Sequence, residues 1–330
     1  MTLNGLFSDH MVLQAGKPVR VFGAGHGAAS VSFLGETREA ALLPDGTWLA
    51  ELGARPCGGP YELSVTLDGE TTVLRDVYVG EVLLCAGQSN MTFTMAEEVT
   101  PESGYESDSL LRVFRVRQVL EGEGRVPCEQ WIESDAAEVG GWPALPWLIG
   151  RGLRRRRDIA VGVVVCAQGA SVIQSWMSEE ALADERLFVP KDELYIDHSY
   201  PDYAAFNPFS KLYHAMFRTI TPFTFGHCVW YQGESNASPA ESRIYTDLLA
   251  AMLACWRGDL RDGLPFIVVQ IADTRETEGW PGVQRAQEKA AALPGVTVVR
   301  SGDVCERNMI HPVTKGPLAE RIADAIERTE

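Results

Sequence analysis

The stretch DVYVGEVLLCAGQSNM, residues 76–91, contains the first long apolar run of the chain. Residues 77–86 show little polar alternation, and such runs are typical of strands buried on both faces of a sheet. The run ends in a turn, after which a hydroxyl, Ser89, stands beside an amide, Asn90. Two interpretations of Ser89 are open here: a nucleophile held at the end of a strand, or an N-cap of the next helix.

Further apolar runs of the same kind follow downstream, at 159–167, 225–231, 265–272 and 296–300. Helical patterns lie between and after them, at 240–256, 281–292 and 315–328. Strands that alternate with helices predict a parallel sheet covered by helices on both faces. The segment from 95 to 158 is richer in Pro, Gly and Trp and gives no fine assignment, but its basic run Arg154–Arg157 is interpreted as the exposed end of a helix.

Residues 1–76 have a different pattern. Short alternating runs such as PVRVF at 18–22 and YELSV at 61–65 are separated by Gly, Pro and Asp-Gly turns, which is typical of a small β-sandwich. We therefore expect two domains: a small all-β sandwich over 1–76 and an α/β domain over 77–330. A structural buttress is the preferred interpretation of the first, ahead of a sugar-binding module.

Composition narrows the class of protein. The 330 residues are 45% apolar and 22% charged, which is ordinary for a globular chain, and the net charge of -16 argues against nucleic acid or an anionic membrane as a partner. The seven cysteines are scattered and never spaced as CxxC, so neither a disulfide framework nor a zinc site is indicated. The N-terminus lacks the pattern of a signal peptide, and we expect a cytoplasmic protein.

Polar residues gather where the expected strands end. The candidates are GQSN at 87–90, QGAS at 168–171, QGESN at 232–236, and SGD at 301–303 with His311 eight residues beyond. Taken singly, Ser89 is explained as a cap and Gly169 by turn geometry. Ligands of an open parallel sheet, however, bind beyond the carboxyl ends of its strands, so these groups should meet at one edge.

Together they are the parts that acyl transfer needs. A serine hydroxyl becomes a nucleophile when an adjacent base takes its proton, and His311 titrates near neutrality. The tetrahedral oxyanion then needs N–H donors, which the backbones of Ser89 and Gly169 and the amide of Gln232 can supply. The chain has no GxSxG elbow, which argues against the common α/β-hydrolase arrangement.

The motifs GQSNM (87–91), WYQGESN (230–236) and IHP (310–312), in this order, resemble the sialate O-acetylesterase family of the SGNH hydrolases. The resemblance covers almost the whole chain and implies a flavodoxin-like α/β/α SGNH domain. It also implies roles for the candidates: nucleophile for Ser89, general base for His311, oxyanion donors for the Ser89 backbone, Gly169 and Gln232, with Asn236 as the alternative amide and Glu234 as a support.

The sequence departs from the family at the triad acid. Many members carry an Asp two or three positions before the histidine, where this chain has Met309 and Asn308. Asp303 is the expected acid, with Glu306 from the same loop as an alternative. A Ser-His dyad assisted by a backbone carbonyl is the other open arrangement.

The expected function is therefore that of a serine carboxylesterase, which removes O-acetyl groups from a small sugar or oligosaccharide, sialic acid first, without metal or cofactor. The alternatives are an esterase of acetyl xylan or other polysaccharide fragments, and a non-catalytic carbohydrate-binding protein. A sialic acid carboxylate would need a cation, for which the candidates are Arg115, Arg117, Arg243 and Arg275. Tryptophans suit either sugar stacking or the core, which is the commoner place for them: Trp142, Trp147, Trp176, Trp230 and Trp280.

Overall fold

The computed structural model describes residues 1–100, 104–120, 128–194 and 201–329. A mixed sheet runs through its centre in the order β11-β10-β12-β9-β13-β14-β15. All neighbours in it pair in parallel except the edge pair β10 and β11, so the parallel sheet expected from the sequence is confirmed. Its strands are β9 (Glu70–Gly87), β10 (Asp108–Arg115), β11 (Trp131–Ser134), β12 (Val161–Ala167), β13 (His227–Tyr231), β14 (Phe266–Val269) and β15 (Val296–Val299).

The strand order places a switch point at β9. Numbered along the chain among themselves, the strands β12, β9, β13, β14 and β15 stand in the flavodoxin-like order 2-1-3-4-5, and β10 and then β11 are added beyond β12. Strand β9 lies between β12 and β13: the chain first builds the sheet on one side of β9, with β10 and β12, and then crosses to β13 on the other side. Ligands of such sheets bind in the crevice where the order reverses. Ser89 lies two residues beyond Gly87, the carboxyl end of β9.

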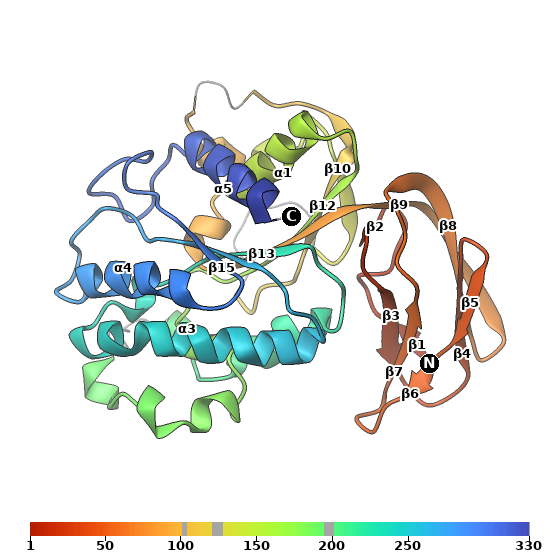
Figure 1. Ribbon diagram of the computed structural model, residues 1–330, viewed down its shortest axis with the longest axis horizontal. Coiled ribbons are helices and arrows are strands. Elements are labelled where there is room, and N and C mark those ends of the chain that lie inside the picture. The colour runs from red at the N-terminus through yellow and green to blue at the C-terminus, as the bar shows by residue number, and fades with distance from the viewer. Residues whose placement is uncertain (101–103, 121–127, 195–200, 330) are drawn as a thin grey trace.

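Helices cover both faces of the sheet (Figure 1). Helices α1 (Ala144–Arg156) and α5 (Gly316–Thr329) pack together on one face, and α3 (Pro239–Leu260) and α4 (Trp280–Lys289) pack together on the other. The basic run ends α1 as expected, and Arg156 pairs there with Glu320 and Asp324 of α5. Among the described residues no helix has both the length and the apolar character to cross a bilayer.

Short helical segments connect these elements. One is α-helical, α2 (Lys211–Ala215). The others are single 3₁₀ turns: η1 (Ser89–Met91), η2 (Met95–Glu97), η3 (Val139–Gly141), η4 (Ile173–Trp176), η5 (Ala181–Ala183), η6 (Glu185–Leu187), η7 (Lys191–Glu193), η8 (Pro201–Ala205), η9 (Phe217–Ile220), η10 (Glu234–Asn236) and η11 (Ala290–Ala292).

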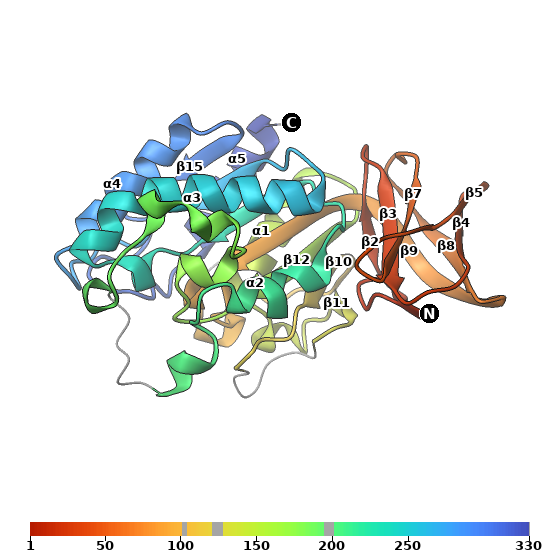
Figure 2. The same cartoon turned by 90° about the horizontal axis from the view of Figure 1, so that it is seen from below.

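The N-terminal part is built of strands and lies beside the large sheet (Figures 1 and 2). One sheet has the order β1-β3-β7-β6, and the others pair with one another and with the first half of β9. Their inward side chains, such as Val31, Trp48 and Leu63, are fully buried. The bounds are β1 (Thr2–Leu3), β2 (Val12–Gln14), β3 (Val19–Ala24), β4 (Ala29–Phe33), β5 (Glu36–Glu39), β6 (Ala41–Leu42), β7 (Thr47–Leu52) and β8 (Gly58–Leu67).

Strand β9 runs through the boundary expected at residue 76. Its first half pairs antiparallel with β8, and its second half pairs in parallel with β12 and β13. The backbone is irregular at that point, because Asp76 has a left-handed φ of 55°. The change of pattern at residue 76 is thus a change of strand environment within one continuous strand, and the division into two domains stays a prediction.

The tryptophans belong to the core. The side chains of Trp142, Trp147, Trp176, Trp230 and Trp280 are all among the fully buried ones. The core interpretation of these residues is therefore confirmed. Three cysteines in the apolar strands, Cys85, Cys166 and Cys228, are buried free thiols, as their apolar surroundings in the sequence suggested.

Candidate active site

Ser89 and His311 meet at the carboxyl end of β9. The Ser89 Oγ lies 2.7 Å from the His311 Nε2, across 222 positions of sequence. The residue before η1 is Gln88, and no side chain caps that turn, so the Ser89 hydroxyl is not serving as an N-cap. The geometry favours the nucleophile interpretation, because the hydroxyl is bonded to a base that can take its proton.

The turn that presents Ser89 is fixed by close backbone packing. Gly87 has a φ of 132°, and a Cβ there would lie 2.1 Å from the Tyr231 carbonyl oxygen. The Gln88 N–H donates to that same oxygen at 3.0 Å. The ends of β9 and β13 are thereby held together, and Ser89 leaves the sheet at the switch point.

Gly169 lies against the nucleophile. A Cβ on Gly169 would lie 3.7 Å from the Ser89 Cβ, and the φ of Gly169 is not in the left-handed region, so turn geometry does not call for glycine here. In the part of the chain that the structure describes, the Ser89 and Gly169 N–H groups donate to no acceptor. Two unbonded N–H donors beside a hydroxyl suit an oxyanion that forms there.

The structure does not give Gln232 the expected role. Its amide Nε2 donates to the Ser171 carbonyl at 2.9 Å and to the Asn236 Oδ1 at 2.8 Å, so both hydrogens are used. Asn236, the alternative amide, donates its own two hydrogens to Gln174 and Glu241. These amides bond to residues of the loop after β12, Ser171 and Gln174, and so hold that loop in place. Buried amides need hydrogen-bond partners, and here both hydrogens of each amide are already used within the protein, so none is left for an oxyanion.

The expected acid, Asp303, is not at the histidine. Both of its carboxylate oxygens accept from Arg321 of α5, at 2.6 and 2.9 Å, and this pairing lowers the pKa of Asp303. The alternative, Glu306, accepts from the hydroxyl and N–H of Thr314. Among the described residues, the only hydrogen bond of the His311 side chain is the one to Ser89. The structure thus gives the expected triad role of Asp303 no contact with His311, because the Arg321 guanidinium on α5 holds its carboxylate.

The environment of His311 favours the neutral imidazole. Burial lowers its pKa first, the positive charge of Lys315 lowers it further, and the carboxylate of Glu97 opposes them. The ring is half-buried and lies against Phe93, with ring centroids 5.1 Å apart. A neutral imidazole at working pH is the form that a general base requires.

A buried polar cluster lies behind the Ser-His pair. Asn90 is fully buried and contacts Glu234, Lys315 and the carbonyl of Ile310. Burial raises the pKa of Glu234 to about 7 and lowers that of Lys315 to about 8. Glu234 was assigned a supporting role from the sequence, but Lys315 was not identified. The lysine directly follows IHPVT, and its nearness to His311 could have marked it as a candidate site residue.

An apolar cavity of about 450 Å³ adjoins the loop that carries Gly169. Asn207 links the two: its Nδ2 donates to the Ala170 carbonyl, and its Oδ1 accepts from the Val172 N–H. Asn207 and Val172 both line the cavity. Its outer wall includes two phenylalanines that are unusually exposed for their size, Phe188 at 74% and Phe209 at 51%.

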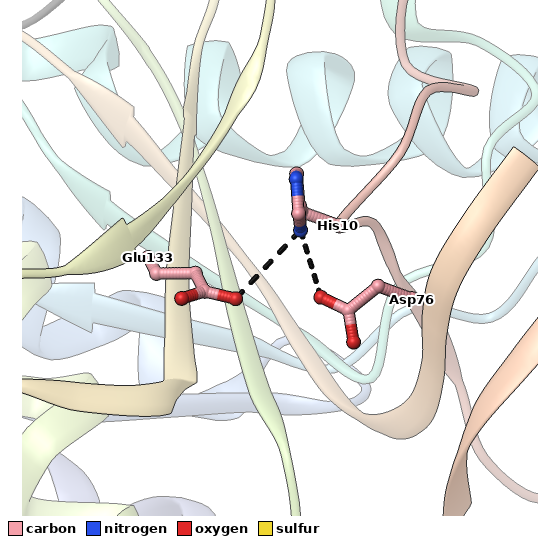
Figure 3. A group of neighbouring side chains, drawn as sticks. All are labelled: His10, Asp76 and Glu133. Atoms are coloured by element: carbon pink, nitrogen blue, oxygen red, sulfur yellow. Dashed lines mark hydrogen bonds and ion pairs between the residues drawn. The ribbon is translucent and has the colours of Figure 1, made fainter.

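The described residues contain one group with the donor atoms of a metal site. His10 points at the carboxylates of Asp76 and Glu133, with its Nδ1 2.7 and 3.7 Å from their oxygens (Figure 3). The same two oxygens accept from Arg112 Nη2, at 2.7 and 3.2 Å. The guanidinium of Arg112 therefore already supplies the cation that these carboxylates need, and the group does not fit a metal ion.

The arginines considered for a substrate carboxylate differ in availability. Arg115 is buried, Arg117 pairs with Glu129, and Arg243 lies 4.0 Å from Glu193. Arg275 is exposed on the loop between β14 and α4, and it makes no ion pair with the described carboxylates. That loop borders the site, because the Asp273 carbonyl accepts from the Asn308 N–H.

Comparisons with known proteins identify the family of the chain. A family described as "Carbohydrate esterase, sialic acid-specific acetylesterase" matches residues 79–327. Human sialate O-acetylesterase is 27% identical over 314 residues, which cover 84% of this chain and 59% of the human protein. The rat enzyme of the same name is 27% identical over 342 residues, covering 84% and 62%. The chain thus spans about three fifths of the length of these relatives.

A solved structure resembles nearly the whole chain. A carbohydrate acetylesterase from Xanthomonas citri superposes with a TM-score of 0.83 and 29% identity, over 99% of this chain and 75% of that one. A protein from Arabidopsis thaliana, 18% identical with a TM-score of 0.50, covers 76% of this chain and 98% of its own and shares the fold alone.

Proposed function

Because this chain belongs to the sialic acid-specific acetylesterase family of carbohydrate esterases, we propose that it is a serine carboxylesterase that removes O-acetyl groups from a sugar. One observation carries the proposal: the 2.7 Å contact between the Ser89 Oγ and the His311 Nε2. The unbonded N–H groups of Ser89 and Gly169 support it. A hydroxyl, a base and two donors at one point are the requirements of acyl transfer.

These positions support the following reaction. The Ser89 Oγ attacks the acetyl carbonyl carbon while the His311 Nε2 takes the hydroxyl proton. The carbonyl oxygen becomes an oxyanion, which accepts hydrogen bonds from the Ser89 and Gly169 N–H groups. The bond to the sugar oxygen then breaks, and the sugar oxygen receives the proton from His311. A water molecule, deprotonated by His311, attacks the acetyl-enzyme, and acetate leaves with Ser89 restored.

We propose that the base works as a dyad. No carboxylate among the described residues bonds to His311, and Glu97 acts on it only through its field. The imidazole is instead held by its contact with Phe93 and by the loop behind it. This arrangement is close to the dyad alternative, but among the described residues no backbone carbonyl bonds to the imidazole, and the charge of a bonded Asp is also missing.

The preferred substrate is an O-acetylated sialic acid. Its carboxylate requires a cation near the site, and the exposed guanidinium of Arg275 is the available one of the four candidates. The loop of Arg275 is bonded to the loop of His311 through Asp273 and Asn308. The alternative, an acetylated polysaccharide fragment, has no carboxylate to bind and would use the same catalytic groups.

Two measurements test the function. First, p-nitrophenyl acetate hydrolysis should be present in the wild type and lost in Ser89→Ala. Turnover that survives this change would return Ser89 to a structural role, and no turnover in the wild type would favour a binding protein. Second, acetylated sialic acid and acetylated xylooligosaccharides should be compared in the wild type, Arg275→Gln and the control Arg285→Gln. A rise of KM of about tenfold for sialic acid alone in Arg275→Gln supports the preferred substrate. Equal effects on both substrates would favour the polysaccharide alternative.

We also propose that the N-terminal strands form a β-sandwich that buttresses the catalytic sheet. Strand β9 supports this, since it pairs with β8 in one region and leads to Ser89 in the other. A chain beginning at residue 77 would lack the first half of β9 and would lose β2 and β8, the partners of residues 77–80, and we expect it not to fold.

A further inference from the structure

The loop of the nucleophile and the loop of the histidine are joined by one buried side chain. Asn90 follows Ser89 in the sequence, and its Nδ2 donates at 3.0 Å to the carbonyl of Ile310, the residue before His311. The second hydrogen of that amide goes to the Glu234 Oε1 at 2.8 Å. The Asn90 side chain therefore connects the two reacting groups: Asn90 is the residue after Ser89, and its amide is hydrogen-bonded to the residue before His311.

The remaining polar atom of Asn90 is held by a buried cation. The Lys315 Nζ donates to the Asn90 Oδ1 at 3.0 Å, and the lysine side chain is only 1% exposed. The ammonium also lies over the ring of Phe93, 5.3 Å from its centroid, and that ring contacts His311. A charge this far from water is costly to bury, so its retention beside the reacting pair calls for an explanation.

Among the described residues, Lys315 makes no tight ion pair that could serve as that explanation. The Glu234 carboxylate reaches Lys315 through Asn90, and its second oxygen, buried Oε2, has no partner among the described residues. A lysine kept only for stability would be expected to bond its carboxylate directly. Here the amide of Asn90 stands between the two charges and divides its bonds between them.

We propose that Asn90 and Lys315 are positioning residues of the esterase reaction: Asn90 fixes the Ser89–His311 contact, and the Lys315 ammonium is a fixed positive charge behind the imidazole. This inference rests on the proposed function and adds to it a charge that keeps the base unprotonated where no triad acid is bonded to it. A nearby cation disfavours the imidazolium, so it lowers the proton affinity of His311 and extends the free-base form to lower pH. In place of a carboxylate that stabilises the protonated base, the site has a charge that favours the free base.

The charged groups around Lys315 belong to several elements. Glu98 follows η2, Glu234 begins η10, and Glu306 and the Cys305 thiol lie in the loop after β15. Burial lowers the lysine pKa to about 8 against the raising effect of these groups. The ammonium is thus protonated at neutral pH, and the Lys315 charge lowers the pKa of His311, whereas Glu97 raises it.

The test separates the charge of Lys315 from its hydrogen bond. Lys315→Met removes both, while Lys315→Gln keeps a donor for the Asn90 Oδ1 and removes only the charge. Lys289→Met, on the exposed side of α4, is the matched control. The readouts are the pH profile of kcat/KM on p-nitrophenyl acetate and the NMR titration of the His311 imidazole, whose signal is assigned as the one missing in His311→Gln.

In both Lys315 variants we expect the acid limb of the profile and the imidazole titration to move to higher pH, while the control stays in place. In Lys315→Met we also expect kcat to fall about tenfold or more with little change in KM, because the hydrogen bond to Asn90 is lost. If the imidazole titration moves in neither variant, the proposed effect of the Lys315 charge on His311 is overturned. A kcat of Lys315→Met within twofold of the wild type overturns the positioning role.

The NMR titration keeps the inference independent of the proposed activity. If the wild type shows no turnover, the proposed function fails, but the imidazole titration still reports whether the Lys315 charge acts on His311. If Lys315→Met does not fold, as judged by its thermal transition, Lys315→Gln carries the test of the charge, and Asn90→Ser carries the test of positioning by the same fall in kcat.

Discussion

The hydroxyl of Ser89 and the imidazole of His311 act through a single hydrogen bond of 2.7 Å. Groups that act as one unit show strongly non-additive losses when removed. We predict that Ser89→Ala and His311→Ala each lower kcat/KM on p-nitrophenyl acetate by about 10³-fold or more, and that the double variant loses no more than the worse single one. Additive losses would mean that the two residues act in separate steps.

Glu97 gives a second prediction at the histidine, of opposite sign to that for Lys315. Its carboxylate raises the pKa of His311, so its removal should lower that pKa. In Glu97→Gln the acid limb of kcat/KM is expected to move to lower pH, by a small amount because Glu97 is exposed and screened by water. The pH profile of kcat/KM measures it, with Glu180→Gln as the exposed control. A shift to higher pH would contradict the assigned charge environment.

Single residues were predictable where a motif fixes both type and place. Ser89 and His311 follow from GQSN and IHP, and their contact was expected from the strand ends alone. The partner of Asp303 was not predictable in this way. Its nearness to His311 in the sequence does not show that Arg321, on the following helix, pairs with Asp303. Gln232 failed for a related reason: its bonds to Ser171 and Asn236 depend on how buried loops pack.

The turn between β9 and η1 gives a prediction about stability. Gly87 is in the left-handed region, and a Cβ there would collide with the Tyr231 backbone. Gly87→Ala is therefore expected to lower the free energy of unfolding by about 3 kcal/mol or more, since strain and a backbone clash add. Urea denaturation followed by circular dichroism measures it.

The matched control for this change is Gly258→Ala in the exposed face of α3. A Cβ at Gly258 meets nothing within 4 Å, and the residue is helical. Alanine is favoured over glycine there, so this variant should be more stable by about 0.5–1 kcal/mol. If Gly87→Ala is as stable as the wild type, the close approach of β9 and β13 is not as tight as described.

Elements were predictable where apolar residues run without interruption. Strands β12, β13, β14 and β15, and helices α3, α4 and α5, lie within a few residues of the ranges that the sequence pattern gives. Strand β10 escaped prediction because its sequence, DSLLRVFR, carries two arginines. Both Arg112 and Arg115 are buried, and a buried charge held by partners from other parts of the chain cannot be recognised from local pattern.

The whole molecule is joined across its two parts by Arg112 of β10. Its Nη1 donates to the carbonyls of His10 and Asp76, its Nη2 to the carboxylates of Asp76 and Glu133, and its Nε to the Ser109 carbonyl. The guanidinium carbon also lies 4.7 Å from the centre of the Tyr78 ring. One side chain thus satisfies acceptors from the N-terminal segment, from β9 at its irregular residue and from β11.

Arg112→Met should therefore destabilise the protein more than any exposed arginine does. The change leaves the carbonyls of His10 and Asp76 without this donor and takes the guanidinium away from two partly exposed carboxylates, of which Asp76 keeps its bond to His10. We therefore expect a loss of about 1–3 kcal/mol. We expect a clear fall of the melting temperature relative to the wild type and to the control Arg285→Met on α4. Thermal unfolding followed by circular dichroism measures both, and equal melting temperatures would show that Arg112 does not join the two parts.

Added zinc ions test whether the group of His10, Asp76 and Glu133 binds a metal ion or is occupied by the Arg112 guanidinium. In the wild type the Asp76 and Glu133 oxygens are occupied by Arg112, so we predict that neither Zn²⁺ nor EDTA shifts its melting temperature. In Arg112→Met the donor atoms of His10, Asp76 and Glu133 remain within 4.8 Å of one another with no cation between them. Imidazole and carboxylate donors bind Zn²⁺, and binding to the folded state alone raises its stability. Zinc should then recover part of the lost melting temperature in Arg112→Met, whereas stabilisation of the wild type by zinc would mean that this group binds metal despite Arg112.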